Sequence, residues 1–172
     1  MKQYISNLLI VLKAEHLKKK GTGIYYTSII IGVLSPILYF FFQIASDDKV
    51  EAGMPYNYYT KFIHDVITPF AYFLFPMIII IHASKMAQLD HKNGGWQLME
   101  TQPIQKFSIY FSKYIVLLIS NILSIISLFG FSILCVFVLK NTIEIPETAN
   151  FSIEFYNLSN LFVRTFVASL FV

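Results

Sequence analysis

Uncharged apolar runs separated by short polar segments dominate the chain. The hydrocarbon core of a bilayer is about 30 Å thick, and a helix needs about 20 residues to cross it. The first and third runs are long enough as they stand, and flanking residues extend the second. The fourth run is short and contains Arg164. We therefore expect transmembrane helices at 24–44, 62–83 and 114–139, and the start of a fourth at 158–172.

Helices are favoured over barrel strands because polar and apolar residues do not alternate within the runs. Pro36, Pro69 and Pro76 fall inside the expected spans, where neighbouring helices can tolerate a kink. The predicted fold is an all-α membrane protein. It is a helical bundle of three full transmembrane helices and the start of a fourth, with an N-terminal interfacial amphipathic helix. A single transmembrane domain covers 1–172.

Composition agrees with this class, since 56% of the 172 residues are hydrophobic and only 13% are charged. Soluble domains carry about a quarter charged residues, so an ordinary soluble domain is excluded.

Lysines are distributed unevenly among the segments between the apolar runs. Segments 1–23 and 84–113 together hold nine lysines and three acidic residues, whereas 45–65 and 140–157 hold three lysines and seven acidic residues. The positive-inside rule places the N-terminus and the 84–113 loop in the cytoplasm and the 140–157 loop outside.

Apolar residues at helical spacing, followed by three lysines, characterise the N-terminal segment 1–23. They indicate a helix lying in the cytoplasmic interface. Its Lys18-Lys19-Lys20 run either meets anionic lipid or only sets the orientation, and the two roles are compatible. The apolar positions of this N-terminal segment are Tyr4, Ile5, Leu8, Leu9 and Leu12.

At the other end of the chain, the sequence stops inside an apolar run. We therefore expect the chain to be the N-terminal fragment of a longer protein.

The 84–113 loop contains a short bounded element. Asn93-Gly94-Gly95 can end a helix, and Pro103 closes the next stretch. Trp96–Thr101 lies between them and carries the only Trp of the chain together with Glu100. A partner protein could bind this element, since a large aromatic residue often anchors an interface. Alternatively, the segment is an ordinary interfacial loop with Trp96 at the lipid headgroups.

The loop resembles the cytoplasmic loop of ABC-2-type ABC transporter permeases. That loop runs Glu, three residues, Gly-Thr, apolar residues, Pro, and a Lys where the next span opens. Asp90 in place of Glu and Gly95 in place of Thr are departures. The likeness implies an ATPase-coupling loop containing Asp90, Gly94, Gly95, Trp96, Leu98, Met99, Glu100 and Pro103, with Lys113 as the closing lysine.

The resemblance implies a permease subunit of an ABC exporter that moves an amphipathic substrate in a bacterial plasma membrane. The richness in Phe, Ile and Tyr is similar to permeases associated with lantibiotic or bacteriocin immunity. Its partners would be a separate ABC ATPase, the lipid bilayer, and either a second copy or a sister permease. The sequence contains no G-x-x-x-x-G-K-[ST] phosphate loop. ATP and Mg would therefore be bound by the ATPase, and this chain would bind no cofactor of its own.

Other chemistry finds little support. The four histidines lack zinc spacing, His64 and His82 are expected at opposite edges of the second span, and the single Cys135 excludes a Cys cluster. We expect no catalytic residue, no metal site and no nucleic-acid partner. The alternative function is a small non-catalytic immunity or assembly protein acting by helix–helix contact. A polar face of the third span either packs against a helix or lines a substrate path, and it contains Ser120, Asn121, Ser124 and Ser127.

Overall fold

The computed structural model describes residues 2–45, 58–95 and 105–142, and single positions at 97, 101, 159, 160, 163, 164 and 167. Helices make up nearly all of this part. They are α1 (Lys2–Lys20), α2 (Ile24–Ala45), α3 (Tyr58–Pro69), a π-helix (Phe70–Leu74), α4 (Phe75–His91), a short 3-10 turn (Lys92–Gly94) and α6 (Lys106–Thr142).

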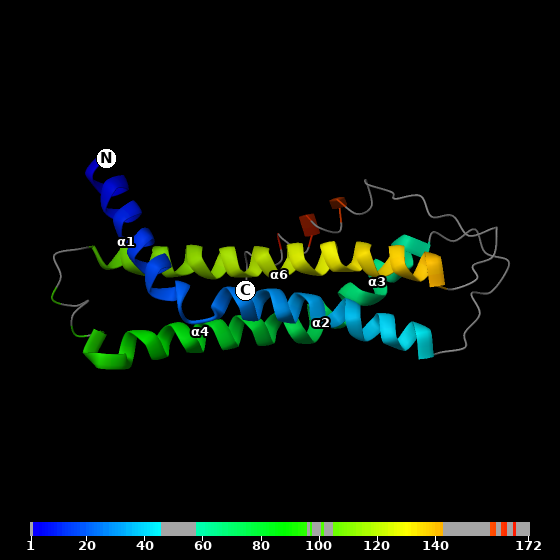
Figure 1. The fold of residues 1–172 in the computed structure, drawn as a ribbon. Helices are drawn as coiled ribbons and strands as arrows, with labels where there is room; N and C mark the ends of the chain where they lie inside the picture. Colours follow the sequence, from blue (N-terminus) through cyan, green and yellow to red (C-terminus); the bar gives the residue numbers. More distant parts are fainter. Residues whose placement is uncertain are drawn as a thin grey trace.

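Three helical stretches are long and apolar enough to cross a membrane, at Ile24–Ala45, Thr60–His91 and Lys106–Thr142. The helices α2, α4 and α6 run side by side, and α1 leans away at one end (Figure 1). The prediction of an all-α membrane protein is confirmed. Of the expected fourth span at 158–172, all but five single positions lie outside the described residues, as does most of 140–157.

The helices extend beyond the spans expected from apolar character alone. α4 continues through His91, and α6 begins at Lys106, so both enter the segment 84–113 that the sequence indicated as a loop. The connection between them is therefore 92–105. The charged residues of these extra turns lie on helices, where they can face one another across the bundle.

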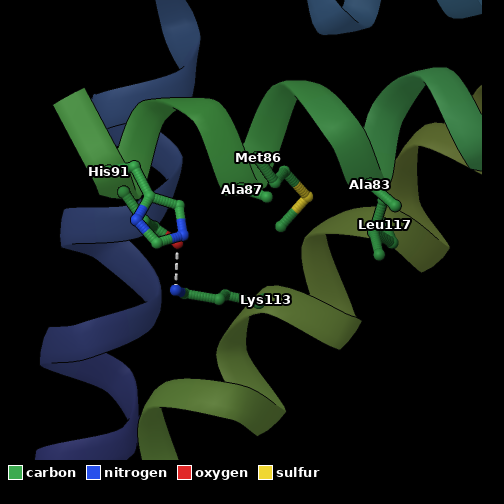
Figure 2. A pocket seen from close by; sticks show the side chains of 7 residues that line it. Ala83, Met86, Ala87, His91, Lys113 and Leu117 are labelled. Atoms are coloured by element: carbon green, nitrogen blue, oxygen red, sulfur yellow. Dashed lines mark hydrogen bonds and ion pairs between the residues drawn. The ribbon is translucent and has the colours of Figure 1, made fainter. Parts of the chain in front are cut away.

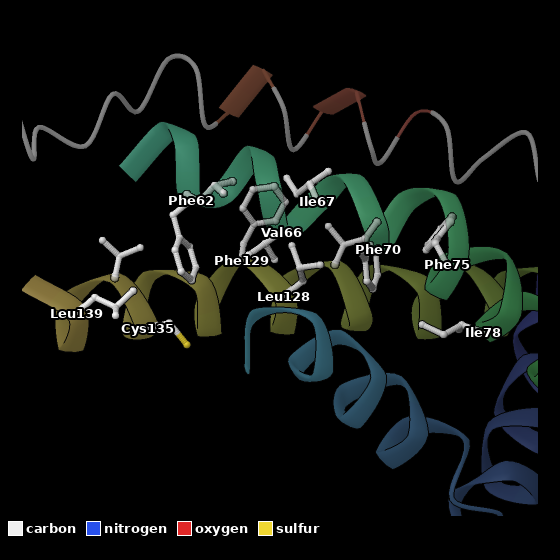
Figure 3. Packing of buried hydrophobic residues seen from close by; sticks show 13 residues of the cluster. Phe62, Val66, Ile67, Phe70, Phe75, Ile78, Leu128, Phe129, Cys135 and Leu139 are labelled. Carbon is white, nitrogen blue, oxygen red and sulfur yellow. The ribbon is translucent and has the colours of Figure 1, made fainter. Parts of the chain in front are cut away.

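The apolar core lies where α3 and the π-helix pack on α6 (Figure 3). Phe62, Val66 and Phe70 contribute from one side, and Leu128 and Phe129 from α6. All five side chains are buried, whereas many other large apolar side chains point outward. Outward apolar surface is what a helix in contact with lipid tails requires.

Small residues let α2 approach α6 closely. A Cβ atom added at Gly32 would come within 3.0 Å of the Ser124 carbonyl oxygen and of the Ser127 hydroxyl. Ser28 and Ser35, on either side of Gly32 along α2, are also buried. Small residues at the contact are the usual means by which membrane helices pack, since lipid provides no hydrophobic force to press them together.

Two prolines account for the π-helix between α3 and α4. Pro69 has no N–H to donate to the carbonyl one turn earlier, and Pro76 lacks one just after the π-helix. The backbone adjusts so that the Phe75 N–H donates to the Phe70 carbonyl, which is a π-type bond. Ser35 Oγ on α2 donates to the Val66 carbonyl at 2.8 Å, which ties α2 to this irregular region.

Candidate functional site

A buried carboxylate joins three helices at the end of α4. Lys18 Nζ of α1 donates to Asp90 Oδ1 at 2.6 Å, and Lys113 Nζ of α6 donates to Asp90 Oδ2. Asp90 is 5% exposed. We call Asp90, Lys18 and Lys113 the Asp90 clamp. Because each carboxylate oxygen binds one lysine, the ends of α1, α4 and α6 are held to a single group.

A second ion pair lies beside the clamp on α1. Lys19 Nζ is 3.0 Å from Glu15 Oε2, and both side chains are buried. Burial lowers the pKa of Lys19, and the charge and hydrogen bond of Glu15 oppose that shift. α1 therefore packs its charged pair inward. Its outer face carries Leu9, Ile10 and Leu17.

The glycine pair that follows α4 has a geometric explanation. Gly94 has a φ of +70°, a conformation that L side chains rarely adopt. A Cβ atom on Gly95 would lie 2.8 Å from the Asp90 carbonyl oxygen. The two glycines thus allow the chain to fold back tightly over the end of α4, directly beside the Asp90 clamp.

The structure brings together three of the residues assigned to the loop, namely Asp90, Gly94 and Gly95. Trp96, Leu98, Met99, Glu100 and Pro103 lie outside the described residues. The segment 92–105 that contains them starts and ends at helices bound by the clamp. Lys92 and Gln105, its first and last residues, therefore adjoin two helices that the clamp joins.

Sequence reasoning did not find the lysine partners of Asp90. In the sequence, Lys113 has only the role of closing the loop pattern, and Lys18 is only part of a lysine run. A usable signal was present, because Asp90 is one of only three acids among nine lysines in segments 1–23 and 84–113. Such an isolated acid lies at the end of one helix, and two neighbouring helix ends carry lysines. It is therefore well placed to form a buried ion pair.

His82 forms a second polar junction among the helices. Its Nε2 is 3.0 Å from Thr27 Oγ1 of α2, and its Nδ1 is 3.2 Å from Ser120 Oγ of α6. The side chain is fully buried. The sequence does not indicate these two partners, and the position of His82 at the inner edge of the second span stays a prediction.

The polar face of α6 is largely buried against its neighbours. Ser120, Ser124 and Asn121 are at most 4% exposed, and the two serines donate to carbonyls of their own helix at 2.8 and 2.9 Å. Ser127 Oγ lies 3.4 Å from the Ile29 carbonyl of α2. Asn121 Oδ1 has no hydrogen-bond partner within the part of the chain that the structure describes. Helix packing accounts for these positions, and a substrate path along them stays a prediction.

The described residues contain no group of three His, Cys, Asp or Glu side chains placed to hold a metal ion.

The fold and these polar ties define a multi-pass helical membrane protein in which ion pairs join three helices at one end. Comparison with known families names it further. A family model described as ABC-2 family transporter protein matches residues 11–172, and the chain belongs to this family. It is thus an ABC transporter permease, a class of membrane subunit that works with an ABC ATPase. No curated protein and no solved structure matches the chain.

Proposed function

We propose that this chain is the permease subunit of an exporter of amphipathic substrates, with segment 92–105 as the docking site for the ATPase. The Asp90 clamp is the observation that supports this most directly. It lies where the segment leaves α4 and holds α1 and α6 to the same carboxylate. A displacement of the segment therefore acts on three helices together.

The length of α6 adds to this argument. Its 37 residues extend for roughly 55 Å at about 1.5 Å per residue. A movement at the clamp is thus carried by one continuous helix to the far side of the bilayer. The ATP and Mg would be bound by the ATPase, and the closure of two ATPase subunits would drive two permeases, either two copies of this chain or this chain and a sister permease.

The proposal requires segment 92–105 and α1 to face the cytoplasm of a bacterial cell, where ATP is available. The clamp supports one part of this, because it brings α1 and both ends of the segment to the same end of the bundle. The excess of lysine at that end favours the cytoplasmic side. A topology reporter fused at position 97 should be read from inside the cell, and a reading from outside would refute the docking role.

The binding step is tested by co-purification with the ATPase. Trp96→Ala and Glu100→Ala should each reduce the amount of ATPase retained, while membrane insertion is unchanged. Tyr72→Ala is the matched control, since Tyr72 is an 85% exposed aromatic residue on the π-helix. Undiminished retention by both loop variants would contradict the proposal.

The coupling step needs a different variant. Asp90→Asn should leave ATPase binding intact, because the Asp90 side chain is buried and lies on α4 outside the segment, but should reduce the substrate-dependent stimulation of ATP hydrolysis. Stimulation equal to that of the wild type would show that the clamp does not transmit the movement.

A further inference from the structure

A cavity of about 240 Å³ lies between α4 and α6, next to the Asp90 clamp (Figure 2). Ala83, Met86 and Ala87 of α4 and Leu117 of α6 form its apolar walls. Its polar end is formed by residues of the clamp and by His91. We call this cavity the α4–α6 groove.

The walls explain why space is left there. Ala83 and Ala87 are one helical turn apart and both exposed, so two short side chains follow each other along the same face of α4. Met86 is buried and contributes to the wall from within the bundle. The stretch Thr60–His91, which ends with α4, and the helix α6 are each long and apolar enough to span a membrane. The groove lies near the end of the first stretch, so it opens at the depth of lipid tails close to one headgroup region.

Basic groups outnumber acidic groups among the described residues at the polar end. The clamp contains two lysines and one carboxylate, and Glu15 pairs with Lys19 beside it. Around it, Lys20, Lys92 and Lys106 are exposed on the described surface. Glu15 and Asp90, the acids described at this end, are both buried. The exposed charge on the described surface around the groove is therefore basic, and it attracts an anionic headgroup.

We propose that the α4–α6 groove binds one anionic phospholipid. The phosphate lies at the polar end beside Lys113, and the upper part of an acyl chain lies against the alanines and Leu117. A basic pocket between membrane helices at headgroup level has the chemistry that retains an anionic lipid headgroup. All lining residues of the groove lie on α4 and α6, outside segment 92–105, so lipid binding can be measured without the ATPase.

The test uses the full chain, purified in detergent and mixed with equal amounts of phosphatidylglycerol and phosphatidylcholine of identical acyl chains. Native mass spectrometry counts the lipids retained. Wild type should hold one phosphatidylglycerol at least about threefold more often than phosphatidylcholine. Ala87→Phe fills the groove and should abolish this preference, and Ala83→Phe provides a second variant at the same wall. Ala71→Phe on the π-helix is the control, because it is an equally exposed alanine outside the groove.

Four results would overturn the proposal. Equal retention of the two lipids by wild type would remove the charge selectivity, and retention by both groove variants as strong as by Ala71→Phe would indicate diffuse binding to surface lysines. Displacement of the lipid by millimolar glycerol 1-phosphate would show that the phosphate alone is recognised. If a groove variant dissociated a dimer while lipid retention persisted, the occupant would be a second copy of the chain.

Discussion

Gly32 sets how closely α2 and α6 approach, and replacing it tests the packing of the bundle. In Gly32→Ala, the new Cβ would lie within 3.0 Å of both the Ser127 hydroxyl and the Ser124 carbonyl oxygen, whereas ordinary contacts lie at 3.4–4 Å. The hydroxyl can rotate away, but the carbonyl belongs to the α6 backbone. The two helices must therefore separate by several tenths of an ångström or more along their contact.

Gly130→Ala is the matched control, because nothing lies within 4 Å of a Cβ atom at that position of α6. Both substitutions stabilise the helix by the same amount, roughly 1 kcal/mol, because Ala has a higher helix propensity than Gly. Only Gly32→Ala also overpacks the contact between α2 and α6. Overpacking typically lowers the free energy of unfolding by about 1–3 kcal/mol, and we expect the upper half of this range because the obstructing atom belongs to the backbone. The free energies of unfolding of the two variants should therefore differ by about 2–3 kcal/mol, with Gly130→Ala the more stable.

The assay is reversible unfolding of the purified full chain in mixed micelles, with helix content followed by circular dichroism as the denaturing detergent is increased. Adding Ser127→Ala to Gly32→Ala removes the hydroxyl but not the Ser124 carbonyl, so it should recover only part of the lost stability. Equal unfolding free energies for Gly32→Ala and Gly130→Ala would refute the close approach of the two helices.

Two further predictions concern buried polar groups. Asp90→Asn removes the carboxylate charge that both lysines bind and should lower the free energy of unfolding by about 3 kcal/mol or more, because breaking a buried ion pair is strongly destabilising. Lys113→Gln should lower the free energy of unfolding more than Lys18→Gln, because the Lys113 side chain is 14% exposed and that of Lys18 is 35% exposed. A lower melting temperature for Lys18→Gln than for Lys113→Gln would contradict the clamp geometry. Ser35→Ala leaves the Val66 carbonyl without this donor and should cost roughly 1 kcal/mol, measured by the same unfolding assay; a change below about 0.3 kcal/mol would show that the bond is not made in the membrane.

Apolar character predicted the fold well because lipid forces every spanning segment to bury its own backbone hydrogen bonds in a helix. The first span, expected at 24–44, is the helix Ile24–Ala45. The later helix ends were less accessible, because charged residues such as Asp90 and Lys113 read as loop when each is considered alone. On the structure they lie on helices that continue beyond the apolar runs, and they pair with one another there.

The candidate site was predictable only in part for the same reason. Asp90, Gly94 and Gly95 stand close together in sequence, so a pattern could find them. Lys18 lies 72 residues from Asp90, and its role depends on how α1 leans against α6. The partners of His82 could not be predicted either, because Thr27 and Ser120, whose hydroxyls lie within hydrogen-bond distance of its ring nitrogens, are 55 and 38 residues away in sequence.

The two polar junctions constrain how α4 can move. His82 and Asp90 are about 12 Å apart along the helix axis, at about 1.5 Å per residue, and each binds α6. Two ties on one helix prevent it from sliding or rotating against α6 without breaking a polar contact at each. Movement applied at segment 92–105 must therefore carry α4 and α6 together. Bending is easiest at the π-helix Phe70–Leu74, where prolines have already interrupted the regular hydrogen bonds between α3 and α4.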